Sequence, residues 1–152
     1  MSKISGRKGK NKVWIIILIV IGVIGAGLIG GILISSPARR EIQELTIADV
    51  NFNKLKDGTY VGEYVGTKDH LRDAKVEVTI SGGKIADIKI LKGALDKEGK
   101  AIEVRNGKSV EDLFDTVVES QSLQVDVISG ATLTSKAHLK ALENALKQAE
   151  TD

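Results

Sequence analysis

Four hydroxyl side chains fall within seven residues near the C-terminal end of the sequence, at Ser129, Thr132, Thr134 and Ser135. They lie at the end of Val125–Ser129, an apolar, β-branched run that predicts a short strand. Gly130 and Ala131 stand among them, and their small size permits close approach of a ligand to the backbone. The cluster therefore marks a turn between a strand and a following helix.

Two interpretations of this cluster are open. A helix N-terminus presents free N–H groups and about half a unit of positive charge, which are the elements of a phosphate site. The alternative is an ordinary helix cap, because Ser and Thr are favoured at that position for local reasons. One cap needs one hydroxyl, however, and four are present.

The segment Asp126–Thr132 reads D-V-I-S-G-A-T and resembles the D-x-x-[ST]-G-A-[ST] flavinylation motif of FMN-binding domains. These domains include the small subunits of the sodium-pumping NADH:quinone oxidoreductase and of the Rnf ferredoxin:NAD oxidoreductase complex. Leu133–Ser135, Leu55–Tyr60 and Gly83–Ile85 also fit the family. The resemblance covers about residues 55 to 150.

The resemblance implies a covalent cofactor. The last threonine of S-G-A-T, which is Thr132 here, would be esterified by the phosphate of FMN. A separate Mg-dependent flavin transferase would perform the attachment, using FAD and releasing AMP, and Asp126 would belong to the signal that this enzyme reads. The phosphate and ribityl end would be lined by Ser129, Gly130, Ala131, Leu133 and Thr134.

One family segment is missing. The larger complex subunits carry an E-T-P-G-L-G segment before the helices, whereas Lys92–Lys108 has three glycines and no such motif. The resemblance therefore does not assign the residues that hold the isoalloxazine ring. The short chain favours a stand-alone carrier of FMN over a subunit of a sodium-pumping complex.

Three strands are predicted before this segment. Thr59–Val65 is aromatic and β-branched, and Ala74–Ile80 alternates apolar and polar residues. Gly82-Gly83 forms a two-residue turn, and Lys84–Leu91 returns with the same alternation. We expect a three-stranded antiparallel meander.

Two helices complete the prediction. Ser109 caps a helix that runs to about Ser120, and Thr134–Glu150 carries a leucine stripe at helical spacing. Lys92–Lys108 is predicted to be a mobile loop. With the strand Val125–Ser129, the order is β-β-β-α-β-α, an α+β fold with helices packed on a small antiparallel sheet.

The N-terminal region predicts a single membrane anchor. Val13–Ile34 holds 22 uncharged residues, which as a helix span roughly 33 Å, close to the hydrocarbon thickness. Residues 1–12 contain five basic residues and no acidic one. The positive-inside bias places this basic tail in the cytoplasm, residues 13–36 in the cell membrane as a single transmembrane helix, and the rest outside.

Two other properties of this region stay open. Cleavage as a signal peptide is an alternative to retention, since Ser35, Ser36 and Ala38 are small. Gly27 and Gly31 form a G-x-x-x-G pair, which can mark the face of a helix dimer.

A helical stalk is predicted over residues 37–56, where apolar and charged residues alternate at roughly helical intervals. It would pack on the outer domain through Phe52 and Leu55. The extracytoplasmic FMN-binding domain would then occupy residues 57–152.

Composition excludes several classes of protein. Cysteine is absent, so disulfides, Fe–S ligation and cysteine catalysis are excluded, and His70 and His138 are too few and too distant to predict a metal site. After residue 36 the chain has 17 basic and 20 acidic side chains, a net charge of −3. The overall +2 therefore comes from the tail and does not indicate nucleic-acid binding.

The preferred hypothesis is a membrane-anchored electron-transfer flavoprotein, with covalent FMN on Thr132. Its redox partner would be a membrane quinone-linked dehydrogenase or another electron carrier. No nucleophilic or proton-transfer constellation is visible, so an electron carrier is favoured over a stand-alone enzyme. The alternatives are an FMN-bearing subunit of a larger membrane redox complex and a flavin-free binding module.

Overall fold

The computed structural model describes residues 37–151. The predicted basic tail, the transmembrane helix 13–36 and the Gly27/Gly31 face lie outside this range. Within it, no helix is both long and apolar enough to cross a bilayer.

A three-stranded antiparallel sheet forms the framework of the outer domain. It consists of β1 (Gly58–Tyr64), β2 (Ala74–Ser81) and β3 (Lys84–Lys92), in the order β1-β2-β3. Gly82 and Gly83 both have positive φ at the β2–β3 turn. Asp57 fixes this turn, since its carboxylate accepts hydrogen bonds from both glycine N–H groups at 3.0 and 2.8 Å. The predicted meander is confirmed.

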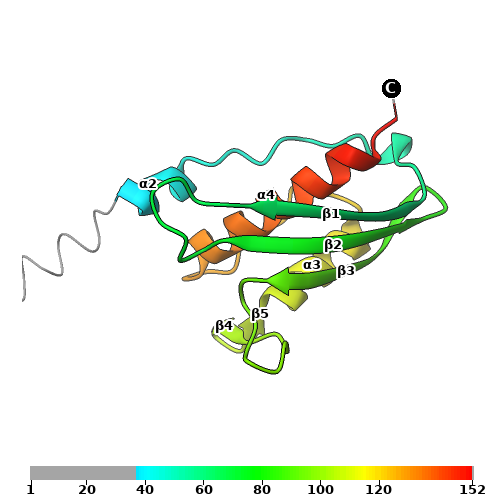
Figure 1. Ribbon diagram of the computed structural model, residues 1–152. Helices are drawn as coiled ribbons and strands as arrows, with labels where there is room; N and C mark the ends of the chain where they lie inside the picture. Colours follow the sequence, from blue (N-terminus) through cyan, green and yellow to red (C-terminus); the bar gives the residue numbers. More distant parts are fainter. Residues whose placement is uncertain (1–36, 152) are drawn as a thin grey trace, which may run out of the picture. The chain divides into compact units, whose positions relative to one another are not determined.

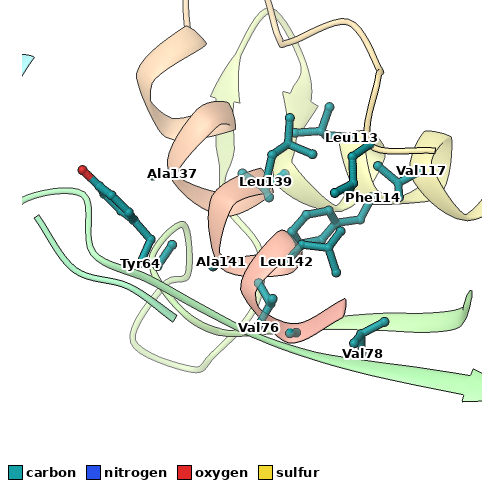
Figure 2. Packing of buried hydrophobic residues seen from close by; sticks show 14 of the residues in the cluster. Tyr64, Val76, Val78, Leu113, Phe114, Val117, Ala137, Leu139, Ala141 and Leu142 are labelled. Atoms are coloured by element: carbon teal, nitrogen blue, oxygen red, sulfur yellow. The ribbon is translucent and has the colours of Figure 1, made fainter. Parts of the chain in front are cut away.

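Two helices cover one face of this sheet (Figure 1). α3 (Val110–Ser120) packs on β3, and α4 (Thr132–Ala149) packs on β1 and β2. Alternate residues of β2 are buried beneath α4, as its sequence pattern predicts. Figure 2 shows Val76 and Val78 of β2 with Leu142 of α4 and Phe114 of α3, where the two helices and the sheet share one core.

The start of α3 follows its sequence closely. The Ser109 hydroxyl accepts a hydrogen bond from the Asp112 N–H at 3.3 Å, and the Asp112 carboxylate accepts one from the Ser109 N–H at 2.6 Å. This capping box satisfies two backbone donors at once, and it confirms the predicted cap.

The segment predicted to be a mobile loop contains regular structure. β4 (Glu103–Arg105) pairs with β5 (Lys108–Ser109), and Leu95 forms an isolated bridge with Ala101. Asp96 organises the intervening turn by accepting hydrogen bonds from the N–H groups of Glu98 and Lys100. The prediction missed these short elements because their pairing depends on a few turn contacts rather than on alternation.

The strand predicted over Val125–Ser129 is absent, so the order β-β-β-α-β-α is wrong in this element. The observed order among the described residues is β1-β2-β3-β4-β5-α3-α4, apart from two short helices near the start. Ile128 is buried, but its N–H donates to the Ser135 side chain rather than to a neighbouring strand. The apolar pattern therefore reflects packing without strand pairing.

The predicted stalk is also not a continuous helix. Its helical parts are α2 (Pro37–Gln43) and the 3₁₀ turn η1 (Phe52–Lys54), and the chain between them runs beside α4 without regular structure (Figure 1). Tertiary contacts override the helical spacing here, because α4 side chains bind the carbonyls that a helix would use internally. The predicted packing through Leu55 is confirmed: it is 7% exposed and forms a bridge with Glu150.

Candidate functional site

The N-terminus of α4 has no side-chain cap. The helix begins at Thr132, two residues earlier than predicted, and Ala131 occupies the capping position. An alanine has no hydroxyl or carboxylate with which to bind the N–H groups of the first turn. The ordinary-cap interpretation of the hydroxyl cluster therefore does not describe this helix start.

The four hydroxyls divide into two kinds. Ser135 is fully buried; its hydroxyl donates to the Ala131 carbonyl at 3.0 Å and accepts from the Ile128 N–H at 3.2 Å. Ser129 and Thr132 are exposed and Thr134 is half-buried, and none of these three hydroxyls bonds to another described residue. Ser135 thus shapes the turn, and the other three are free to meet a ligand.

Gly130 and Arg105 lie in close contact at this turn. Gly130 has φ +80°, and a Cβ placed on it would lie 3.0 Å from Arg105 Nε. A side chain at this position would be both strained and crowded. Ala131 and Leu133, which the resemblance assigns to the phosphate and ribityl end, are only 9% and 8% exposed, so they anchor the turn to the core.

A pocket of about 300 Å³, the Thr132 pocket, opens at the first turn of α4. Two arginines from distant parts of the chain line it, Arg39 from α2 and Arg72 from the β1–β2 connection. The other lining residues are Gln43, Gly130, Ala131, Thr132, Leu133 and Thr134. Two cations, a helix N-terminus and free hydroxyls make this pocket suited to an anion.

A second pocket of about 220 Å³, the His138 pocket, shares Arg72 and Thr134 with the first. Its remaining walls are mainly apolar, formed by Leu71, Asp73, Gly93, Ala94, Ile102, Val104 and His138. Leu71 is 81% exposed and Ile102 is 42% exposed. An apolar pocket that continues from an anion site suits a ligand with a phosphate at one end and a flat ring at the other.

His138 closes the base of this second pocket. It is 2% exposed, its Nδ1 donates to the Thr134 carbonyl at 2.8 Å, and its Nε2 accepts from the Ala94 N–H at 3.4 Å. Burial lowers the pKa of His138 below 6.5, and the bond to Thr134 only partly opposes this. The imidazole is therefore neutral at pH 7 and joins α4 to the loop that follows β3.

Asp126 lies in a different pocket of about 250 Å³. It is exposed there, with Arg105 and Lys108 among the lining residues, and it makes no ion pair with a described residue. The structure thus brings Gly130–Thr134 together in one pocket, while Asp126 and Ser129 face another. No group of three potential metal ligands occurs among residues 37–151.

Sequence reasoning missed the arginines. Arg39, Arg72 and Arg105 are each more than twenty residues from the motif and belong to three separate elements or connections. No local pattern marks them, since only the tertiary fold brings them to the turn.

Residues 70–147 match the family model described as the FMN-binding domain. The chain belongs to the FMN-binding domain family. This membership supports FMN as the cofactor and a redox role for the domain.

Curated relatives with different names match part of this chain. The chain is 32% identical over 108 residues to the NADH:acrylate oxidoreductase of Vibrio harveyi, covering 70% of this chain and 10% of that protein. An uncharacterized protein of Treponema pallidum is 35% identical over 95 residues, covering 62% and 24% respectively. A protein named glutamyl-tRNA reductase in Methanosarcina acetivorans is 27% identical over 135 residues, covering 84% and 29%.

One solved crystal structure, of a Clostridium perfringens protein, also matches. It covers 62% of this chain and 88% of its own, at 30% identity and a TM-score of 0.43. The chain spans less than a third of the length of the three curated relatives named above.

Proposed function

We propose that this protein is a membrane-anchored electron-transfer flavoprotein that carries FMN covalently on Thr132. The observation that carries the proposal is the setting of Thr132: an exposed hydroxyl on the first residue of an uncapped helix, in a pocket with two arginines. A phosphodiester keeps one negative charge, which a helix N-terminus and guanidinium groups stabilise.

The attachment is a phosphoryl transfer from FAD. The Thr132 oxygen forms a bond to the FMN-side phosphorus, the bond from that phosphorus to the AMP oxygen breaks, and AMP leaves. The hydroxyl hydrogen is released as a proton, and no oxidant or reductant is needed. A separate Mg-dependent flavin transferase, which the resemblance implies, would supply the catalysis.

Each end of FMN would occupy one of the two adjoining pockets. The phosphate and ribityl end would lie in the Thr132 pocket, and the isoalloxazine ring against the apolar wall of the His138 pocket, near Leu71 and Ile102. When bound, the flavin supplies one- or two-electron transfer. The protein's own contribution is to hold the cofactor and to set its surroundings.

Asp126 would serve maturation rather than redox chemistry. It is exposed and makes no hydrogen bond or ion pair with another described residue, so the folded domain does not need it for stability. A carboxylate that stands free beside the modified turn is available to a modifying enzyme.

The membrane location rests on the sequence of residues 1–36. With the basic tail in the cytoplasm and residues 13–36 in the cell membrane, the flavin domain would face outward. A covalent bond would then keep the cofactor from diffusing away, and the redox partner would be a quinone-linked dehydrogenase or another carrier.

Coexpression of the full chain with a flavin transferase tests the proposal. We expect flavin fluorescence in a denaturing gel for wild type, its loss in Thr132→Val, and a reduced yield in Asp126→Ala. Glu119→Ala removes an exposed carboxylate of α3 and serves as the control. Wild-type fluorescence in Thr132→Val would reject Thr132 as the attachment residue, and a colourless wild type would favour a flavin-free binding module.

A second candidate is an FMN-bearing subunit of a larger membrane redox complex. The observation that favours it is the similarity of this chain to 10% of a much longer protein that is named as an oxidoreductase. Copurification of integral membrane subunits from native membranes would support this candidate over a stand-alone carrier.

A further inference from the structure

Residues 37–50, called here the 37–50 segment, are held firmly on α4 although they lie outside the family match at 70–147. Lys136 Nζ donates to the carbonyls of Gln43 and Leu45 at 2.6 and 3.0 Å, and Lys140 Nζ donates to the Thr46 carbonyl at 3.2 Å. Glu143 of α4 accepts from the Ala48 N–H at 3.0 Å. These bonds fix the part of the segment from Gln43 to Ala48 on α4.

Burial and a second set of bonds fix the other side of the segment. Ala38, Ile42 and Val50 are at most 6% exposed. The Glu41 carboxylate accepts hydrogen bonds from the Thr67 N–H at 2.9 Å and the Thr67 hydroxyl at 3.0 Å. The segment is thus bound both to α4 and to the connection between β1 and β2.

Arg72 is held by the same connection. Its neighbour Asp73 is 7% exposed and accepts hydrogen bonds from the Gly66 N–H at 3.1 Å and from Lys92 Nζ at 2.9 Å. These bonds fix the position of Asp73, and with it the backbone position of the adjacent Arg72. Since Glu41 ties α2 to this connection, Arg39 and Arg72 line one pocket from two elements.

Neither arginine is engaged elsewhere. Within residues 37–151, the side chains of Arg39 and Arg72 make no hydrogen bond or ion pair, and no acidic residue lines the Thr132 pocket. Guanidinium groups bind phosphate oxygens through planar, paired N–H donors. Two unpaired guanidinium groups beside the Thr132 hydroxyl, which would receive the phosphoryl group, constitute a site for a phosphate.

We propose that Arg39 and Arg72 form a clamp for the flavin phosphate, and that the 37–50 segment is therefore part of the flavin site. This inference rests on the proposed function, since it concerns how the same pocket receives FMN or the FMN half of FAD. A domain limited to the family match would lack Arg39 and Gln43, and with them one side of the clamp.

The test separates phosphate recognition from covalent attachment. In full-length protein carrying Thr132→Val, the affinities for FMN and for riboflavin, which lacks the phosphate, are measured by fluorescence titration. We expect FMN to bind about tenfold tighter than riboflavin, and Arg39→Gln or Arg72→Gln to abolish most of this preference. Arg40→Gln, an exposed neighbour on α2, is the matched control.

A second measurement decides the case if that affinity is too weak to titrate. With Thr132 intact, the rate of flavin attachment by the transferase should fall about tenfold in Arg39→Gln and Arg72→Gln relative to Arg40→Gln. Unchanged preference and unchanged rate, with wild type still flavinylated, would overturn the clamp alone. A wild type that is never flavinylated would overturn the proposed function, and the clamp with it.

Discussion

Thr132 and Ser135 both carry a hydroxyl in the first turn of α4, and their surroundings give them opposite roles. Ser135 satisfies the Ile128 N–H and the Ala131 carbonyl inside the protein. The Thr132 hydroxyl is exposed and bonds to no described residue. The presence of a hydroxyl does not distinguish the two residues; the direction in which each side chain leaves the helix does.

The two residues should therefore separate stability from flavin attachment. Ser135→Ala is expected to lower the free energy of unfolding by about 1–3 kcal/mol, because it leaves the buried Ile128 N–H without a partner. Thr132→Val should change it by less than about 0.5 kcal/mol. Urea denaturation of both variants measures the difference, and equal losses would contradict these roles.

At the scale of elements, the approach of α4 to the sheet depends on Gly62 in β1. A Cβ on Gly62 would collide with the backbone of Ala141 and Ala145 in α4. Ala141 and Ala145 are fully buried, so small residues on the helix allow the same close packing. This contact fixes α4, and with it the position of Thr132.

Gly62→Ala should be destabilising, although replacing a strand glycine usually helps. The methyl group would force α4 away from β1, at a cost of about 1–3 kcal/mol in unfolding free energy. Val61→Ala, at a neighbouring position that is 38% exposed, is the control and should cost less. A Gly62→Ala protein as stable as wild type in urea would show that the helix does not press on this strand.

Local patterns predicted the elements whose residues interact with near neighbours in sequence. The β2–β3 hairpin follows from alternation and the Gly82-Gly83 turn, and the start of α3 follows from Ser109 and Asp112. Local patterns failed where distant residues determine the path. Lys136 and Lys140 of α4 bind carbonyls of the 37–50 segment that a continuous helix would use internally. Ser135 accepts a hydrogen bond from the Ile128 N–H, which in a strand would have bonded to a neighbouring strand.

The candidate site was predictable to the same extent. The motif groups Ser129 with Gly130–Thr134, and the structure gathers Gly130–Thr134 in one pocket while Ser129 lines another. Arg39 and Arg72 could not be found in this way, because their proximity to the turn arises from contacts such as Glu41 with Thr67. A resemblance confined to the domain also gives no reason to include residues before it.

At the scale of the whole molecule, burial of neutral His138 couples folding to pH. Its pKa is lowered from 6.5 in the folded state, so below pH 6.5 the unfolded chain binds a proton that the folded chain does not. The contribution of neutral His138 to the free energy of unfolding is therefore fully present above pH 6.5, and it falls as the pH drops toward the folded pKa. One proton gives a slope of at most about 1.4 kcal/mol per pH unit.

Urea unfolding at pH 7.5 and 5.5 checks this dependence. Wild type should lose stability over the interval, and His138→Gln, although less stable throughout, should show a flatter response. Asp73 lines the same pocket, and hydrogen bonding from Lys92 lowers its pKa below 3.8, so it stays ionised over this range. A slope that is the same in both proteins would assign the dependence to another group.

Covalent attachment of FMN to Thr132 is best tested by intact mass spectrometry of the protein extracted from native membranes. One measurement reports whether a flavin is attached and whether residues 1–36 are retained. We expect the mass of the full chain plus one FMN less one water, and the loss of that increment in Thr132→Val. A native protein with the unmodified mass of its chain would contradict covalent FMN on Thr132.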